Sequence, residues 1–357
     1  MRYIPRNCLT EHAMLAKPIL GSRGEVLLES GIKMTMPYIK RLERLGISGA
    51  YVEDPLSEGL EVVSAISDEL RSDAVRLISS IYAAPVKKYS SARLNALKIM
   101  KIAEHIVDEI IAQRDTVVNL IDIKTYDSYT FFHCVNVAVL CVVIGLGLDL
   151  PKYELVDLAY SSLMHDIGKI FINKTIINKP GELTEDEYET VKTHSKEGYR
   201  YIKDKYLTPE MVARGVSDHH ERVDGKGYPE GKKGTEISLF GRIIGVADVY
   251  DALISDRPYR KGLFPVEAVE YIQGGAGSNF DFDIVSVFSR KIAPFPIGAC
   301  VLLSDGTSGI VVENTEGFPL RPLLRIFKHA GEDVTSYELD LKQSSFDVTI
   351  IETIRTV

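Results

Sequence analysis

The segment YELVDLAYSSLMHDIGK, residues 153–169, is the stretch of sequence from which fold and function are best inferred. Its first twelve residues form an apolar helical pattern, and an adjacent histidine and aspartate, His165 and Asp166, follow at the end. An imidazole supplies a neutral nitrogen and a carboxylate can bridge two cations, so this pair suits a metal site. Gly168 would let another segment approach closely. A histidine–aspartate pair is common, however, and is a weak signal by itself.

Further candidate ligands lie on either side of this segment. Five of the eight histidines fall between residues 133 and 220, and Asp248 lies in the apolar helical segment that follows. Each has an ordinary alternative: a satisfied core histidine, a surface pair, or an aspartate paired with an arginine or capping a helix. Together they offer five imidazoles and two carboxylates, enough for two divalent ions. Mixed nitrogen and oxygen ligands favour iron, manganese, zinc, cobalt or nickel over calcium and magnesium. The set is His133, His165, Asp166, His194, His219, His220 and Asp248.

Composition limits the classes of protein that fit. The chain has 357 residues, of which 45% are hydrophobic and 26% charged, as in soluble globular proteins of two or three domains. Disordered, collagen-like and disulfide-framework chains are excluded. The net charge of −8 argues against binding to DNA or to an anionic membrane. A phosphate-bearing ligand would therefore need local basic groups.

The expected location is cytoplasmic. The four cysteines are scattered without a CxxC pair and are interpreted as reduced thiols. The N-terminal residues lack the continuous apolar core of a signal peptide. The longest apolar run, residues 137–148, is about half of the ~20 residues that a membrane span needs, so we interpret it as a buried helix.

The sequence predicts a mainly α fold in four parts. Residues 1–56 form a small mixed α/β unit, and residues 57–118 form a helical linker region. Residues 119–293 form an all-helical domain that carries the candidate ligands, and residues 294–357 form a small β-rich appendage. The helices of residues 57–118 could pair with a second copy of the chain as a homodimer. The alternative is amphipathic helices packed on their own domain.

Three motifs give the helical part a resemblance to a known family. HDIGK (165–169), HHERVDGKGYP (219–229) and ADVYDALISDRPYRK (247–261) resemble the HD-GYP family of the HD phosphohydrolase superfamily. The second motif is highly specific, whereas the histidine–aspartate pair alone is not. The match covers residues 125–293, roughly half of the chain, and the flanking units resemble those of some members more loosely.

The resemblance implies an activity and a role for each matching residue. Such proteins are metal-dependent phosphodiesterases that hydrolyse cyclic di-GMP to pGpG, to GMP or to both, through a binuclear centre and a bridging hydroxide. Iron or manganese is the expected metal, with other transition metals left open. The implied ligands of one ion are His133, His165, Asp166 and Asp248, and those of the second are His194, His219 and His220, with Asp166 bridging.

Substrate and partner contacts are implied in the same way. Asp166 and Lys169 match the catalytic motif, and Lys169 is expected to face the scissile phosphate. Arg257 and Arg260 match residues that contact phosphate or guanine. The loop of Gly227, Tyr228 and Pro229 matches a segment tied to partner contacts, and Tyr228 is a further expected substrate contact.

Two departures from the family pattern refine these expectations. Some members carry a glutamate four residues before the first histidine and bind a third metal, but Tyr129 stands there, so two metals are expected. Phe132 and Cys134 flank His133 where a basic residue and a serine are usual, and neither change removes a ligand. The alternatives are a cyclic di-GMP-binding adaptor with weak or no catalysis, a phosphodiesterase for another cyclic dinucleotide such as cyclic GMP-AMP, and a di-iron oxygenase.

Overall fold

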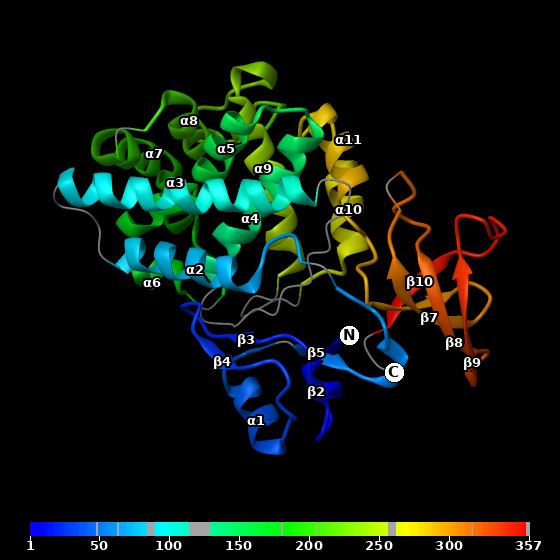
Figure 1. The fold of residues 1–357 in the computed structure, drawn as a ribbon. Helices are drawn as coiled ribbons and strands as arrows, with labels where there is room; N and C mark the ends of the chain where they lie inside the picture. The colour runs from blue at the N-terminus through cyan, green and yellow to red at the C-terminus, as the bar shows by residue number, and fades with distance from the viewer. Residues whose placement is uncertain are drawn as a thin grey trace.

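The computed structural model confirms a mainly α fold flanked by two small β-containing units (Figure 1). It describes residues 1–47, 49–62, 64–83, 89–113, 129–179, 181–206, 208–255, 262–315 and 317–354. Helices account for about half of the described residues, and strands gather at the two ends of the chain. The helical body lies between these units in sequence and carries the candidate ligands.

Ten helices of the described residues build the helical body. Helix α4 packs against α2, α3, α5, α9 and α11, and α8 packs against α5, α7 and α9. The helices are α2 (Asp68–Ala83), α3 (Tyr89–Ala112), α4 (Tyr129–Gly147), α5 (Lys152–Met164), α6 (Lys174–Ile177), α7 (Glu185–Tyr201), α8 (Glu210–Asp218), α9 (Leu239–Ile254), α10 (Pro265–Gly274) and α11 (Phe282–Lys291).

Helix α4 is the centre of this body. It contains no Asp, Glu, Lys or Arg, and its described residues from Phe132 to Val143 are all buried. A helix that is apolar on all sides is stable only when it is surrounded by other elements. The interpretation of residues 137–148 as a buried helix is confirmed over residues 137–145, and the helix itself ends at Gly147 with its last two residues partly buried. No helix among the described residues combines the length and apolarity needed to cross a lipid bilayer.

The N-terminal unit combines short strands with one helix. Strands β1 (Arg2–Pro5), β5 (Gly49–Glu53) and β2 (Met14–Leu15) form an antiparallel sheet in that order, and β3 (Ile19–Leu20) pairs with β4 (Val26–Leu28). Helix α1 (Met36–Arg44) begins where the Thr35 side chain accepts a hydrogen bond from the Tyr38 amide. The N-terminal unit has a small core of its own, which includes Leu15, Met34, Leu42 and Ile47.

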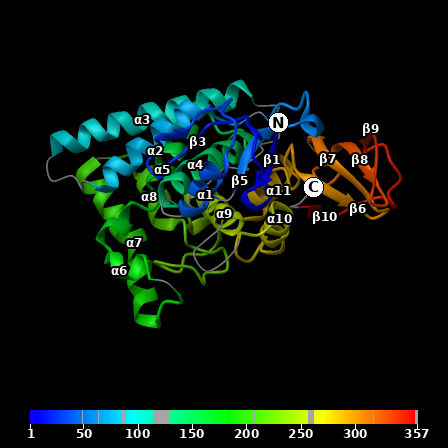
Figure 2. The same cartoon turned by 90° about the horizontal axis from the view of Figure 1, so that it is seen from below.

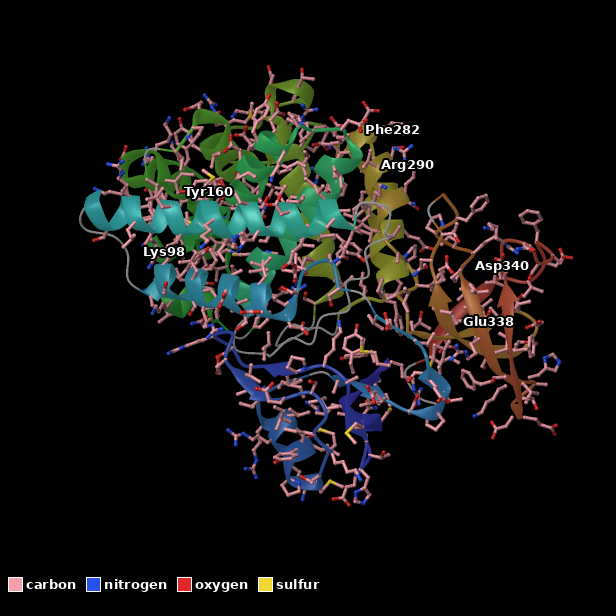
Figure 3. The ribbon with its side chains drawn as sticks, viewed as in Figure 1. Lys98, Tyr160, Phe282, Arg290, Glu338 and Asp340 are labelled. Carbon is pink, nitrogen blue, oxygen red and sulfur yellow. The ribbon has the colours of Figure 1, made fainter. Side chains whose placement is uncertain are left out.

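The C-terminal unit is a five-stranded antiparallel sheet in the order β10, β6, β7, β8, β9. The edge strand β9 is rich in charged side chains, and Figure 3 shows Glu338 and Asp340 on it. Charged side chains on an exposed edge oppose pairing with other sheets. The strands are β6 (Cys300–Leu303), β7 (Thr307–Glu313), β8 (Leu323–His329), β9 (Glu332–Asp340) and β10 (Ile350–Ile354).

The two β-containing units contact each other beside the helical body (Figure 2). Leu60 packs with Cys300, Ile310 and Phe327 of the C-terminal sheet. The Arg325 guanidinium donates to the Glu58 carbonyl at 2.6 Å. The segment that follows β5 is therefore fixed against the C-terminal sheet.

The described helices between residues 57 and 118, α2 and α3, contribute to the main core. Ile78 of α2 and Ile106 of α3 are fully buried in the same cluster as the residues of α4. Of the residues that precede α2, positions 58–62 and 64–67 are not helical, so the helical pattern begins later than the sequence suggests. On α3, Leu94 and Leu97 remain exposed, and pairing with a second copy stays a prediction.

Replacing Leu140 by alanine tests the central position of α4. Leu140 is fully buried, so Leu140→Ala should lower the free energy of unfolding by about 2–5 kcal/mol. Thermal and denaturant unfolding of the whole chain measure the effect. The matched control is Leu97→Ala on α3, where the leucine is 62% exposed and the change should be within about 0.5 kcal/mol. Equal effects of the two substitutions would contradict the packing described here.

Candidate metal centre

The seven candidate ligands come from five helices and converge inside the helical body. His133 lies in α4, and His165 and Asp166 follow the end of α5. His194 lies in α7, while Asp248 lies in α9. His219 and His220 follow the last turn of α8. All are buried except His220, which is half-buried.

His133, His165 and Asp166 form the first group. Each offers one nitrogen or carboxylate oxygen within 4.8 Å of the others. Asp248 adjoins this group, with its Oδ1 3.0 Å from His133 Nε2 and 4.0 Å from His165 Nε2. Two imidazoles and two carboxylates at these separations can share one divalent ion.

His194, His219 and His220 form the second group, again within 4.8 Å of one another. His194 Nε2 and His219 Nε2 are 3.3 Å apart. The two groups meet at Asp166, whose Oδ2 lies 3.5 Å from His165 Nε2 and whose Oδ1 lies 3.5 Å from His194 Nε2. Asp166 therefore presents one oxygen to each group.

Two buried atoms at this meeting point lack a hydrogen bond. His165 Nε2 and Asp166 Oδ1 are inaccessible to solvent and have no hydrogen-bonding partner among the residues that the structure describes. Leaving a buried polar atom without a partner costs free energy, so such atoms in a folded protein call for an explanation. A cation held between the groups would satisfy both, and the donor set fits a transition metal.

Main-chain carbonyls fix the orientation of three rings. The Nδ1–H of His165 donates to the Ser162 carbonyl at 2.7 Å, and that of His219 donates to the Val216 carbonyl at 2.7 Å. His194 bonds in the same way to the carbonyl three residues before it, at 2.6 Å. With Nδ1 occupied by the proton, each ring turns a lone pair on Nε2 toward the centre. This is the tautomer that binds metal ions.

The environment also favours neutral imidazoles in the second group. Burial lowers the pKa of His194 and, more strongly, that of His219. Burial also lowers the pKa of His220 to about 3. A neutral imidazole is the form that donates its lone pair, so this group needs no deprotonation near neutral pH.

The first group is more strongly charged. Burial opposes protonation of His133, but hydrogen bonds with Asp248 and Asp251 outweigh it and raise the pKa of His133 to about 9. Burial would raise the pKa of Asp166, yet the Lys169 ammonium holds that pKa well below its usual range. Asp166 is therefore ionised and available to a cation.

Gly168 allows the two groups to meet. A methyl group at this position would lie 1.8 Å from the carbonyl oxygen of His194 and 2.7 Å from the amide nitrogen of Gly198. Residues 167–171, which form a short 3₁₀ helix, therefore touch the backbone of α7 directly. The expectation that Gly168 permits a close approach is confirmed.

The loop after His220 places an aromatic ring over the second group. The rings of Tyr228 and His220 have centroids 4.7 Å apart and an interplanar angle of 31°. Glu221 holds the loop by accepting the amide hydrogens of Glu230, Gly231 and Lys232 at 2.7–3.1 Å. Tyr228 thus forms part of the wall of the site.

Two lysines supply basic groups at the site among the described residues. Lys169 donates a hydrogen bond to Asp166 Oδ2 and remains partly exposed beside the cluster. Lys192, which the sequence analysis did not single out, lies 5.8 Å above the Tyr228 ring. Arg257 and Arg260 lie outside the described residues.

The supporting hydrogen bonds of His133 were also missed in the sequence analysis. Asp251 Oδ2 accepts the Nδ1–H of His133 at 2.7 Å, and Asn136 donates to the other oxygen of Asp251 at 3.0 Å. The signal was available, because Asn136 follows His133 by three residues and Asp251 follows Asp248 by three, which are same-face spacings in a helix.

Comparisons with known proteins agree with this geometry. Residues 106–284, half of the chain, match the family described as HD domain, and residues 300–354 match a KOW domain associated with the HD domain. A cyclic di-GMP phosphodiesterase of Pseudomonas aeruginosa is 35% identical over 274 residues, 76% of this chain and 66% of that protein. A 3'3'-cGAMP-specific phosphodiesterase of Vibrio cholerae is 39% identical over 158 residues, 43% of this chain and 35% of that protein.

A solved structure shows the same fold. It is a Bdellovibrio bacteriovorus protein described as an HDG"Y"P protein, with a TM-score of 0.50 and 14% sequence identity, and the match covers 80% of this chain and 97% of that chain. Because the HD domain match covers half of the chain, the chain belongs to the HD domain family. The HD domain that the sequence motifs indicate is confirmed. The chain spans 66% of the length of the Pseudomonas aeruginosa relative and 35% of that of the Vibrio cholerae relative.

Replacing Gly168 by alanine tests the contact that joins the two groups. Because the added methyl group would meet backbone rather than a flexible side chain, we expect Gly168→Ala to lower the free energy of unfolding by about 1–3 kcal/mol. It should also reduce the metal content of the purified protein, measured by elemental analysis. Gly274→Ala is the control and should retain its metal, because no described atom beyond its chain neighbours and the backbone of its own helix lies within 4 Å of the added methyl group. A metal content in Gly168→Ala equal to that of the control would refute this role.

Proposed function

We propose that this chain is a metal-dependent phosphodiesterase that hydrolyses cyclic di-GMP at a binuclear centre, giving pGpG, GMP or both. The observation that carries the proposal is Asp166, a buried carboxylate with one oxygen near each of two groups of histidines. The relatives named as phosphodiesterases for cyclic dinucleotides support the same class of substrate. Iron or manganese remains the expected metal.

The donor atoms support two ions rather than one. His133, His165 and Asp248 would hold one ion, and the three remaining histidines would hold the other, with Asp166 between them. When bound, such ions acidify a water molecule and neutralise the charge that develops on phosphate oxygens. The protein's part is to keep the rings oriented and the carboxylates ionised.

Side chains at the rim are suited to an anionic substrate with aromatic bases. Lys169 and Lys192 place positive charge beside the cluster in a chain whose net charge is −8. A phosphodiester would be drawn to these ammonium groups despite the overall negative charge. The Tyr228 ring, which packs on His220, offers an aromatic surface for a base next to the phosphate.

A second candidate substrate is 3'3'-cyclic GMP-AMP. It is favoured by the Vibrio cholerae relative, which is 39% identical over the 158 residues it shares with this chain. The two substrates share the phosphodiester ring and differ in one base. Parallel assays with both cyclic dinucleotides at equal concentration distinguish them, and the higher kcat/KM identifies the substrate.

Substitutions of the shared carboxylate test the activity. Asp166→Asn and His165→Ala should each lower kcat for cyclic di-GMP by more than about a hundredfold, because a metal ion contributes several kcal/mol and 1.4 kcal/mol is tenfold. Release of pGpG and GMP by anaerobically purified, metal-loaded protein is the measurement. His105→Ala, at an exposed histidine of α3, is the control and should keep wild-type turnover. Absence of turnover in metal-loaded wild-type protein, with tight binding of the dinucleotide, would favour a signalling adaptor instead.

Metal removal should also lower stability. Because the ions bind only the folded site, metal at about one hundred times its dissociation constant adds about 2.7 kcal/mol per ion. The unfolding temperature of chelator-treated protein should therefore rise on addition of Mn²⁺. The Asp166→Asn protein should show a smaller rise, and an unchanged unfolding temperature in the wild-type protein would contradict the site.

A further inference from the structure

A buried arginine from outside the HD domain match reaches toward the metal centre. Arg71 lies in α2, its side chain is almost completely buried, and residue 71 precedes the matched residues 106–284. Its Nη1 donates a hydrogen bond of 2.7 Å to Asn136 Oδ1 in α4. A guanidinium is costly to bury without acceptors, so this placement needs a compensating interaction.

The hydrogen bonds continue from Asn136 to a candidate ligand. Asn136 Nδ2 donates to Asp251 Oδ1 at 3.0 Å, and Asp251 Oδ2 accepts the Nδ1–H of His133 at 2.7 Å. The other ring nitrogen, His133 Nε2, faces Asp248 Oδ1 at 3.0 Å. Four buried side chains thus connect α2 to the first group of ligands.

The two ends of this chain of hydrogen bonds fix its direction. A guanidinium can only donate, so it must meet the carbonyl oxygen of Asn136 and not the amide nitrogen. The amide of Asn136 then points its NH₂ at Asp251, whose Oδ1 accepts the hydrogen bond. Asp251 in turn holds a proton of His133 on Nδ1, so that Nε2 is the nitrogen a metal ion would take on displacing its proton.

We propose that Arg71 is a positioning residue of the metal centre, acting through Asn136 and Asp251 to set the tautomer and orientation of His133. This inference rests on the proposed metal site. It adds that the site is incomplete without α2, so that a segment preceding the HD domain match tunes the affinity for one of the two ions.

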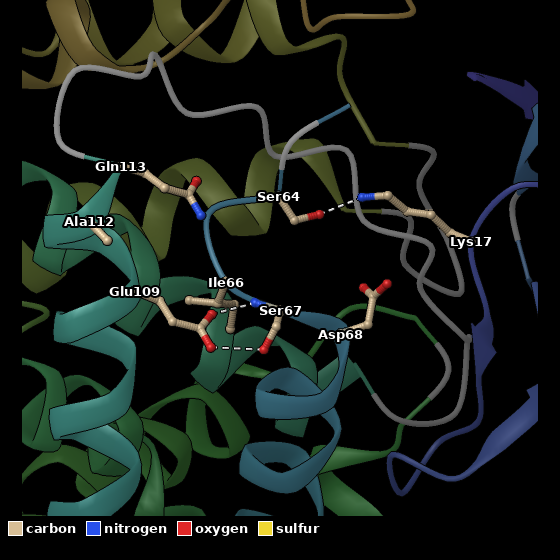
Figure 4. A pocket seen from close by; sticks show the side chains of 8 residues that line it. All are labelled: Lys17, Ser64, Ile66, Ser67, Asp68, Glu109, Ala112 and Gln113. Atoms are coloured by element: carbon tan, nitrogen blue, oxygen red, sulfur yellow. Dashed lines mark hydrogen bonds between the residues drawn. The ribbon is translucent and has the colours of Figure 1, made fainter. Parts of the chain in front are cut away.

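The start of α2 is held in place as this role requires. The carbonyl of Ser67, which directly precedes α2, accepts the Arg71 amide. The hydroxyl and the amide of Ser67 both donate to the Glu109 carboxylate of α3 (Figure 4). Ser67 and Glu109 also line an open pocket of about 410 Å³ (Figure 4). Lys17 of the N-terminal unit and Ser64 line it too, and Lys17 donates a hydrogen bond to Ser64. The position of Arg71 is therefore set by both α3 and the N-terminal unit.

Metal affinity tests the inference without relying on turnover. We expect Arg71→Met to weaken binding of one Mn²⁺ equivalent by about 10–100-fold, the usual effect of removing a group that orients a ligand, and to leave the second equivalent unchanged. Titration against a fluorescent chelator measures both affinities, and unfolding of the metal-free protein measures folding. Arg76→Met is the matched control, because Arg76 lies on the same helix with its side chain 58% exposed, and it should bind both ions as wild type does.

A double substitution tests whether Arg71 acts through Asn136. If it does, Asn136→Ala should weaken the same equivalent, and the Arg71→Met/Asn136→Ala protein should bind no more weakly than Asn136→Ala alone. Wild-type affinity in Arg71→Met, or additive losses in the double variant, would overturn the inference. A wild-type protein that binds no metal would instead overturn the proposed function.

If Arg71→Met does not fold, Arg71→Lys replaces it. Lysine keeps the buried positive charge and a donor but lacks the planar fork of the guanidinium. The inference expects weaker binding of the same Mn²⁺ equivalent in a folded protein, whereas wild-type affinity would overturn it.

Discussion

The candidate metal centre depends on a direct contact between two backbones. At Gly168 the chain passes so close to α7 that an added methyl group would lie 1.8 Å from the His194 carbonyl oxygen. This approach brings Asp166, two residues before the glycine, within 3.5 Å of His194 Nε2. The apolar packing of α4 and α5 supplies the rigid support, and the glycine removes the one atom that would keep the two groups of ligands apart.

Around that contact, the helical body concentrates polar groups where burial makes each of them costly. Carbonyls three residues earlier in the chain orient His165, His194 and His219, so the helices themselves fix the tautomers. The same burial that excludes water keeps the imidazoles of the second group neutral. Site and core are therefore one structure: the packing that stabilises the fold also selects the protonation state that a cation requires.

The sequence predicts those features that local patterns encode. The helix preceding His165, the requirement for glycine at position 168 and the β-rich end of the chain follow from periodicity and turn residues, and the motifs indicate the HD domain family. The hydrogen bond from Arg71 to Asn136 does not follow in this way. Arg71 and Asn136 are 65 residues apart, and no local spacing predicts that α2 reaches α4. The first helix of this region also begins later than the sequence predicts. Amphipathic spacing persists through residues 58–67, but the described residues of that segment are not helical.

The sharing of one hydrophobic core by α2, α3 and the matched helices bears on how such proteins diversify. The family match begins at residue 106, but the shared hydrophobic core extends to helices that precede it. Recombination that exchanged the preceding segment would have to supply a new cation opposite Asn136 and new apolar side chains against α4. Evolutionary exchange of this segment is therefore limited by an internal electrostatic requirement, and α2 and α3 are expected to be inherited together with the helices of the HD domain match.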